Sequence, residues 1–313
     1  MDAFVFPLLN GLIHGLLLFM VSAGLTLIFG MMGVLNLAHA SFYMLGAYFA
    51  YMLQGRVGFA AALVLATVLA GAVGAGVERW FLRRVHRHGH AHELLLTFGL
   101  SFIIAESIKL FFGNYPVDYR IPKVLDVAAF AIGSQQYPLY RLLMGGVALA
   151  MFAAIWLLLT RTRVGIVVRA AIHKPQMVEA LGHNVQLVFM GVFGVGAALA
   201  GLAGAIAGAF YTTSPNMALE IGVMVFVVVV VGGLGSLGGA MLASLLIGVM
   251  TSLAVGVDRS LADLAALVGA RAWAEGVGGL LTLKVSSLAA TLPFALMLLA
   301  LLLRPGGLLG EKG

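Results

Sequence analysis

Long apolar runs constrain the fold of this chain more than any other feature of its sequence. Hydropathy gives nine candidate spans, at residues 5–31, 37–54, 57–78, 93–113, 139–160, 186–211, 219–232, 238–257 and 286–303. A helix of about 20 apolar residues crosses a bilayer core of about 30 Å, and most of these runs approach that length. Charged residues make up only 10% of the chain, against roughly 25% in soluble domains. We therefore predict an all-α polytopic membrane protein in which residues 1–313 form one transmembrane domain.

Two connections between the runs are very short, around residues 33–36 and 233–237. Each connection either joins two full crossings or turns back within the membrane, so we expect eight to ten transmembrane or half-membrane helices. The N-terminal segment lacks the basic region of a cleaved signal peptide, and we expect it to remain as a helix.

The segment Gly24–Tyr48 contains a polar interruption of an apolar run. The run breaks over Gly30–Gly33 and is followed within a few positions by Asn36, His39 and Ser41. Polar side chains and loosened backbone occur at membrane depth only where protein or a water-filled path surrounds them. The interruption therefore predicts part of a route through the membrane and not a simple anchor.

A second segment of the chain resembles this interruption. Gly33–Leu37 and Gly233–Leu237 each follow a long apolar run, and each leads into a helix rich in small residues. The resemblance suggests a duplicated architecture with discontinuous helices near residues 30–41 and 232–239, which is a recurring way to build a transport path. The glycines of the second segment are equally consistent with close helix packing alone.

Basic residues gather in three segments of the chain. They are Arg79, Arg83, Arg84 and Arg87; Arg161, Arg163, Arg169 and Lys174; and Arg304 and Lys312. The positive-inside rule makes these segments cytoplasmic. Counting crossings between them places the N-terminus outside and the C-terminus in the cytoplasm, with residues 114–138, 212–218 and 258–285 outside. The net charge of +6 is then mainly a topology signal, and without a basic face interleaved with aromatics we expect no nucleic-acid partner.

Two polar segments are open to more than one interpretation. In the external segment 258–285, apolar residues at helical spacing (Leu261, Leu264, Leu267 and Val268) predict an amphipathic helix at the outer surface. That helix either docks an external partner or packs across the mouth of the bundle. The histidine-rich run at 83–93 is better explained as a solvated cytoplasmic loop than as a metal site, because no cysteine or carboxylate cluster completes a ligand set.

The cytoplasmic segment 161–186 is too long for a tight turn and too amphipathic to cross the membrane. Pro175 is suited to the first turn of a short helix, and Gly182 or Asn184 can end it. The helix would carry a small apolar ridge formed by Met177, Val178 and Leu181. Such a ridge either docks a protein partner or packs back on the membrane domain.

Three stretches of the chain together resemble a known family. They are Gly24–Tyr48, Thr162–Asn184, and Val230–Gly239 taken with Leu303–Gly310. They resemble the shorter permease subunit of the branched-chain amino acid class of ABC importers, and the likeness runs over nearly the whole chain with the expected spacing.

The resemblance implies a role for two sets of residues. The translocation path would include Asn36, His39, Ser41, Tyr43, Gly232, Gly233 and Ser236. The loop that couples to an ATPase would include Arg169, Ala170, Pro175, Met177, Glu179, Ala180 and Gly182. Further implied are a bacterial cytoplasmic-membrane location, two cytoplasmic ATPase subunits, a second homologous permease or a second copy of this chain, and an extracytoplasmic binding protein. No cofactor or metal is implied.

The chain departs from the family pattern at two places. Ala40 and Ser41 stand where the family has Gly followed by Glu or Asp, so a carboxylate that could meet an ammonium group is missing. The resemblance implies branched-chain or hydrophobic amino acids as cargo, whereas the missing carboxylate favours a hydrophobic or aromatic carboxylate, or another small amide or acid. His183 replaces the usual Ile after Gly182, most simply as a polar surface residue.

An ion-coupled secondary transporter of small organic solutes is the main alternative. Ion coupling needs ionisable groups that face the bundle interior, and the candidates are Glu106 with Lys109, His14 and His39. Glu106 and Lys109 are three residues apart, so they share a helix face and are expected to pair.

A membrane enzyme is a weaker alternative, since the sequence holds neither an HExxH nor a GxSxG motif. The sequence also lacks the Walker A pattern GxxxxGK[ST], so ATP hydrolysis is expected on partner subunits.

Overall fold

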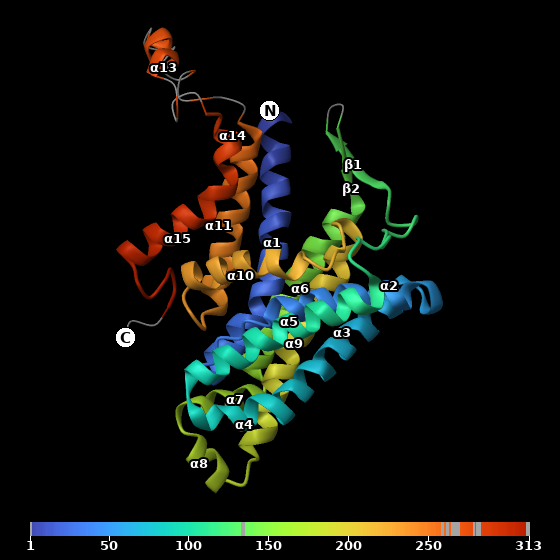
Figure 1. The fold of residues 1–313 in the computed structure, drawn as a ribbon, viewed down its shortest axis with the longest axis vertical. Helices are drawn as coiled ribbons and strands as arrows, with labels where there is room; N and C mark the ends of the chain where they lie inside the picture. Colours follow the sequence, from blue (N-terminus) through green and yellow to red (C-terminus); the bar gives the residue numbers. More distant parts are fainter. Residues whose placement is uncertain are drawn as a thin grey trace.

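The computed structural model describes residues 2–132, 135–257, 260, 263, 270–277, 279 and 283–310. Most of this part of the chain is helical (Figure 1). Within the described residues, seven helices are long and apolar enough to cross a membrane. The prediction of an all-α polytopic membrane protein is confirmed.

Each of the nine predicted spans contains a helix. The helices are α1 (Asp2–Met32), α2 (His39–Val57), α3 (Phe59–Val77), α5 (His90–Phe112), α6 (Leu139–Arg161), α9 (Val185–Phe210), α10 (Met217–Gly232), α11 (Leu237–Gly256) and α15 (Leu292–Leu303). A short helix α14 (Val285–Leu288) and one 3₁₀ turn precede α15 and extend that span. With 16 residues, α10 rises about 24 Å, somewhat less than the hydrocarbon thickness of about 30 Å.

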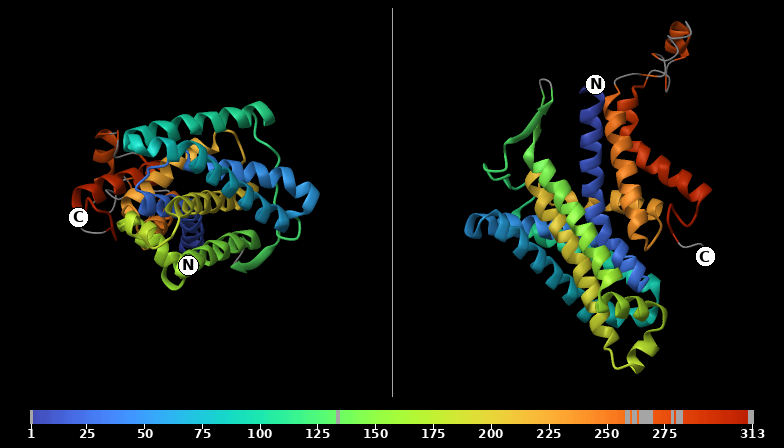
Figure 2. Two further views of the ribbon diagram at one scale, coloured as in Figure 1. Left: turned by 90° about the horizontal axis from the view of Figure 1, so that it is seen from below. Right: turned by 180° about the vertical axis from the view of Figure 1, so that it is seen from behind.

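Helix α1 runs through the middle of the bundle, beside α11 on one side and α9 on the other (Figures 1 and 2). Helices α2 and α3 pack on the far side of α9. Small residues make the close contacts: a Cβ added at Gly248 of α11 would lie 2.4 Å from the carbonyl oxygen of Gly11 in α1. Such backbone-to-backbone contact is how membrane helices associate without a hydrophobic driving force.

Connections that were predicted to lie on the same side of the membrane meet in the structure. Between α5 and α6, strands β1 (Ala128–Ile132) and β2 (Gln135–Pro138) form an antiparallel hairpin. A backbone bridge between Val117 and Thr213 joins this connection to the one between α9 and α10. The sequence prediction treated residues 114–138 as an outer loop and did not anticipate the hairpin.

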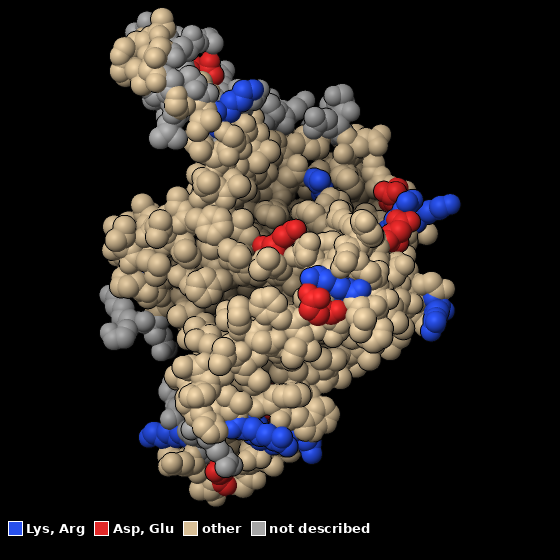
Figure 3. Space-filling model, in the orientation of Figure 1, with Lys and Arg blue, Asp and Glu red and all other residues tan. Residues whose placement is uncertain are grey.

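The first two basic segments lie at the end of the molecule opposite the hairpin. This end holds α4 (Arg83–Val85), α7 (Arg163–His173) and α8 (Pro175–Ala180) (Figure 1). Figure 3 shows Lys and Arg side chains across this lower end. The two segments are about 80 residues apart in sequence, and their meeting at one end is what the positive-inside assignment requires.

The predicted external amphipathic helix falls mostly outside the described residues. Leu261, Leu264, Leu267 and Val268, which carry its apolar spacing, all do so. Within residues 258–285 the structure describes a short helix α13 (Arg271–Val277) and a backbone bridge between Ser260 and Lys284.

Candidate translocation and coupling site

The first interruption begins later than the sequence predicted. Helix α1 continues through Gly30 to Met32, and the chain leaves it at Gly33, whose φ is +67°. Residues 33–38 then connect to α2. Gly30 stays helical because its missing side chain serves a contact: a Cβ there would lie 3.0 Å from Cα of Gly235. The break therefore lies at the last residue of the predicted range Gly30–Gly33, and Gly30 is a packing glycine and not the helix breaker.

Asn36 shapes the connection between α1 and α2. It is 3% exposed, and its Oδ1 accepts a hydrogen bond from the Ala38 amide at 3.1 Å. Its own carbonyl accepts from the His39 amide at 3.1 Å. These bonds form a turn of the kind that Asn side chains commonly stabilise. From α5, the Thr97 hydroxyl oxygen accepts from the Leu37 amide at 3.2 Å and holds the same connection in place.

His39 joins α2 to α1. It is 2% exposed, and its Nε2 lies 2.9 Å from the carbonyl oxygen of Val21. A carbonyl only accepts, so Nε2 carries the proton. Its Nδ1 has no hydrogen-bond partner within the described part of the chain. The ring packs against Gly24, where an added Cβ would lie 2.8 Å from Cε1.

Ser41 and Tyr43 are also buried, at 2% and 4% exposure. They belong to the part of α2 that packs on α9, where Phe42 meets Phe193 edge-on with ring centroids 6.0 Å apart. A Cβ added at Gly204 of α9 would lie 1.7 Å from the Tyr43 carbonyl oxygen. The predicted path residues of the first interruption are thus all buried between helices of this chain.

The second interruption separates α10 from α11. Gly233 and Gly235 have φ of +101° and +85°, conformations that favour glycine. Ser236 begins α11, with its hydroxyl oxygen accepting from the Gly239 amide at 3.1 Å, as an N-cap does. A Cβ added at Gly232 would lie 2.5 Å from the Gly239 carbonyl carbon, so the two helices cross in backbone contact.

The C-terminal segment completes the second interruption, and sequence reasoning missed this. The Leu308 and Leu309 amides donate to the carbonyl oxygens of Val231 and Gly232 at 2.9 and 3.1 Å. These carbonyls belong to the last turn of α10 and would otherwise lack partners. A signal was present in the sequence, since glycine-rich stretches occur at both places, Gly232–Gly239 and Gly306–Gly310.

The second interruption packs on the end of α1. Gly30, in the last turn of α1, and Gly235, in the second interruption, are in direct backbone contact. This junction joins the second interruption to the helix that leads into the first. Ser236 is half-buried next to this junction, whereas Gly232 and Gly233 are buried.

The segment 161–186 folds as two short helices. Thr162 caps α7, its hydroxyl oxygen accepting from the Gly165 amide at 3.1 Å. Helix α8 starts at Pro175 and is ended by Gly182, whose φ is +85°. Asn184 instead caps the next helix, α9, by accepting from the Leu187 amide at 3.1 Å. The short helix predicted from Pro175 is therefore present, and α7 is an addition that the prediction lacked.

The predicted apolar ridge on α8 is divided between two faces. Met177 and Leu181 are 58% and 78% exposed. Val178 is 4% exposed and packs with Ala171 and Val185. The prediction that Val178 belongs to an exposed ridge was therefore wrong. Residues 177 and 181 are one helical turn apart and share a face, whereas 178 points back to α7 and α9. The other predicted coupling residues whose burial is described are exposed: Arg169, Ala170, Glu179, Ala180 and Gly182.

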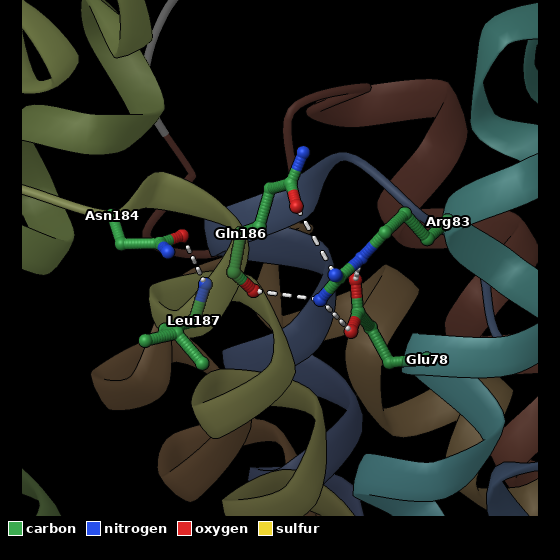
Figure 4. A network of polar contacts seen from close by, with 5 residues as sticks. All are labelled: Glu78, Arg83, Asn184, Gln186 and Leu187. Carbon is green, nitrogen blue, oxygen red and sulfur yellow. Dashed lines mark hydrogen bonds and ion pairs between the residues drawn. The ribbon is translucent and has the colours of Figure 1, made fainter.

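A guanidinium group anchors the start of α9 (Figure 4). Arg83 donates through Nη2 to Oε2 of Glu78 at 3.0 Å and to the carbonyl oxygen of Gln186 at 3.1 Å. Its Nη1 donates to Oε1 of Gln186 at 3.1 Å. Glu78 is 3% exposed and lies in a π-helical turn that follows α3. We call Glu78, Arg83 and Gln186 the arginine clamp.

The histidine-rich run contacts a buried carboxylate. Glu93 is 1% exposed, and Nδ1 of His86 and Nδ1 of His90 both lie against it, the latter at 3.2 Å. His90 also lies beside the first interruption, with Cε1 3.8 Å from a Cβ placed on Gly33. Among the described residues, no group of three or more His, Asp or Glu is arranged to hold a metal ion.

Glu106 and Lys109 form the predicted pair on α5. Nζ of Lys109 lies 2.6 Å from Oε1 of Glu106. The Glu106 side chain is 66% exposed and the Lys109 side chain 32%. The pair therefore lies on the outside of this chain, not between its helices.

Comparison with known proteins agrees with this architecture. Residues 8–301 match the model of a family described as the permease component of branched-chain amino acid transport systems. No solved structure matches the chain.

Curated relatives come from bacteria and an archaeon. The high-affinity branched-chain amino acid transport system permease protein LivH of Escherichia coli K12 is 29% identical over 266 residues, covering 80% of this chain and 85% of the relative. The corresponding BraD protein of Pseudomonas aeruginosa is 27% identical, covering 97% and 95%. A probable LivH of Methanocaldococcus jannaschii is 25% identical, covering 96% and 91%. The chain thus belongs to the family of permease components of branched-chain amino acid transport systems.

Proposed function

We propose that this chain forms half of the translocation path of an ATP-driven importer in the bacterial cytoplasmic membrane. Its cargo is a branched-chain or other hydrophobic amino acid, or a related small carboxylate or amide, delivered by an extracytoplasmic binding protein. Two cytoplasmic ATPase subunits and a second permease, homologous or identical to this chain, complete the assembly. The N-terminus is outside and the C-terminus in the cytoplasm.

The observation that carries this proposal is the exposed face of α8. Met177 and Leu181 present apolar surface at the basic end of the molecule, on a helix too short to cross a membrane. Exposed apolar surface rimmed by polar residues marks a protein-docking site. An ATPase groove is the occupant that fits a permease of this family.

Motion of α8 has a continuous route to the interruptions. Val178 packs α8 against Val185 in the first turn of α9, and the arginine clamp holds Gln186 next to it. Further along α9, toward its C-terminus, Gly196 is in backbone contact with Gly24, beside the His39 ring. A displacement of α8 therefore moves α9 against the α1–α2 junction. ATP and cargo shift such an equilibrium only through different affinities for its states.

The chemistry around the first interruption suits an uncharged or acidic cargo group better than an ammonium group. Within the described residues, the Asn36 amide nitrogen is buried without a hydrogen-bond partner and can donate. Position 41 carries a serine where a carboxylate would attract a positive charge. This supports a cargo recognised through its carboxylate or amide and its apolar body.

The test is co-purification and transport with the charged variant Met177→Glu/Leu181→Glu. We expect the variant to lose the co-purifying ATPases and ATP-driven uptake in proteoliposomes, while the permease keeps its elution volume. Tyr115→Glu, which alters a side chain 83% exposed between α5 and β1, is the matched control and should behave as wild type. Unchanged uptake in the double variant, or recovery of the wild-type chain without any Walker-motif ATPase, would favour an ion-coupled transporter.

A further inference from the structure

An apolar groove of about 480 Å³ opens beside α7, and none of its lining residues belongs to the predicted path or coupling residues. Its floor is formed by Leu27 of α1, Val168 of α7 and Val192 of α9. Its walls come from the outer faces of α6 and α9. The volume lies in the range of ligand pockets, about 300–1,000 Å³.

The walls of the groove face outward at the end of two spanning helices. Leu158 in the last turns of α6, and Leu187 and Val195 in α9, are 40%, 53% and 44% exposed. Exposed apolar side chains on membrane-spanning helices are suited to contact lipid tails, so we infer that the groove opens toward the hydrocarbon.

The rim of the groove is basic. Arg163 and His183 are its only polar side chains among the described lining residues, and none of these lining residues is acidic. Arg163 begins α7, and Arg161 precedes it at the end of α6, where it is exposed. The groove thus combines an apolar channel with cations at the level where α6 ends.

We propose that this groove binds one anionic phospholipid, with an acyl chain between α6 and α9 and the headgroup phosphate on Arg163 and His183. Clusters of basic side chains beside spanning helices attract anionic headgroups, and the charge complementarity selects such a lipid over a neutral one. The proposal rests on the proposed orientation only in assigning the lipid to the cytoplasmic leaflet. It does not require transport.

Gly191 allows the groove to be filled without disturbing the packing. A Cβ placed there meets nothing within 4 Å, so Gly191→Leu extends into the open groove. Gly146 of α6 is also open on an exposed helix face, which makes Gly146→Leu the matched control. The double variant Arg163→Gln/His183→Gln removes the two basic side chains of the rim. Its control is Arg84→Gln, which removes an exposed arginine at the same end that does not line the groove.

The experiment is native mass spectrometry of the full chain after detergent exchange, titrated with phosphatidylglycerol or phosphatidylcholine. We expect wild type, Gly146→Leu and Arg84→Gln to retain one phosphatidylglycerol per chain and at least fivefold less phosphatidylcholine. The rim variant and Gly191→Leu should each lose phosphatidylglycerol retention at least fivefold, with unchanged elution volume and melting temperature.

The proposal would be overturned if wild type retained phosphatidylglycerol and phosphatidylcholine equally. It would also be overturned if the rim variant and Gly191→Leu both retained phosphatidylglycerol as wild type does. So would a photo-crosslinker at position 187 that captures a partner protein and no lipid in native membranes. Lipid retention is measured without ATPases, so its result is independent of the importer assignment.

Discussion

At the scale of single residues, the polar groups of the first interruption have structural partners as well as a predicted place on the path. Asn36 caps a turn, and His39 bridges two helices through one ring nitrogen. A histidine that served only as a cargo ligand would not need its ring fitted against a glycine, as His39 is against Gly24. Among the described residues, the second ring nitrogen has no hydrogen-bond partner, and we propose it as the atom that would contact cargo.

Changing His39 separates these two roles. We expect His39→Leu to lower the free energy of unfolding by about 1–2 kcal/mol, the usual worth of a buried hydrogen bond together with its packing. His39→Gln, which keeps a donor, should lose less. Thermal unfolding of the purified chain measures the stability, and proteoliposome uptake measures the function. If His39→Gln keeps wild-type stability and uptake, then the ring takes no part in transport.

The arginine clamp gives a second prediction at this scale. Arg83→Gln leaves the buried Glu78 carboxylate without its ion pair, which should cost about 2 kcal/mol, within the range for hydrogen bonds to charged groups. Glu78→Gln/Arg83→Gln removes both charges and should be less damaging than Arg83→Gln alone. A double-mutant cycle by thermal unfolding tests this. Additive effects of the two substitutions would show that the pair contributes no coupling.

At the scale of elements, the apolar runs predicted the helices well, because a spanning helix is specified by its own residues. Short-range signals also gave correct predictions: α8 begins at Pro175 and is ended by Gly182. Signals that depend on a distant partner failed. The sequence predicted Gly30 as a helix breaker, whereas in the structure it packs against Gly235. The sequence also predicted an exposed Val178, whereas it is buried against α7 and α9.

The docking of the C-terminal segment onto α10 is the clearest long-range contact of this kind. Gly307 has φ of +80°, and a Cβ there would lie 2.4 Å from Cα of Gly233. Gly113 has a similar φ of +83° but open space around it. Both Gly→Ala substitutions carry a conformational cost of about 1–2 kcal/mol, and only Gly307→Ala adds a backbone collision.

We therefore expect Gly307→Ala to reduce uptake and to lower the melting temperature clearly more than Gly113→Ala does. Equal melting temperatures for the two variants would show that the C-terminal segment does not hold the second interruption in place.

At the scale of the whole molecule, two polar ends are separated by a bundle whose spanning helices expose apolar side chains. The β1–β2 hairpin lies at one end, and α4, α7 and α8 lie at the other (Figure 1). The basic segments favour the second end as cytoplasmic, because positively charged loops are retained there. The coupling proposal depends on this orientation, since α8 must reach the ATPases.

Cysteine labelling can determine the orientation, since the chain contains no cysteine of its own. Tyr115, between α5 and β1, and Leu181, directly after α8, are 83% and 78% exposed. Tyr115→Cys and Leu181→Cys therefore report on the two connections that we predict on opposite sides of the membrane. We expect a membrane-impermeant maleimide to label Tyr115→Cys in intact spheroplasts and Leu181→Cys only after permeabilisation. The unaltered chain is the control and should remain unlabelled throughout. The reverse pattern would place α8 outside the cell, where no ATPase could engage it, and would refute the coupling role of Met177 and Leu181.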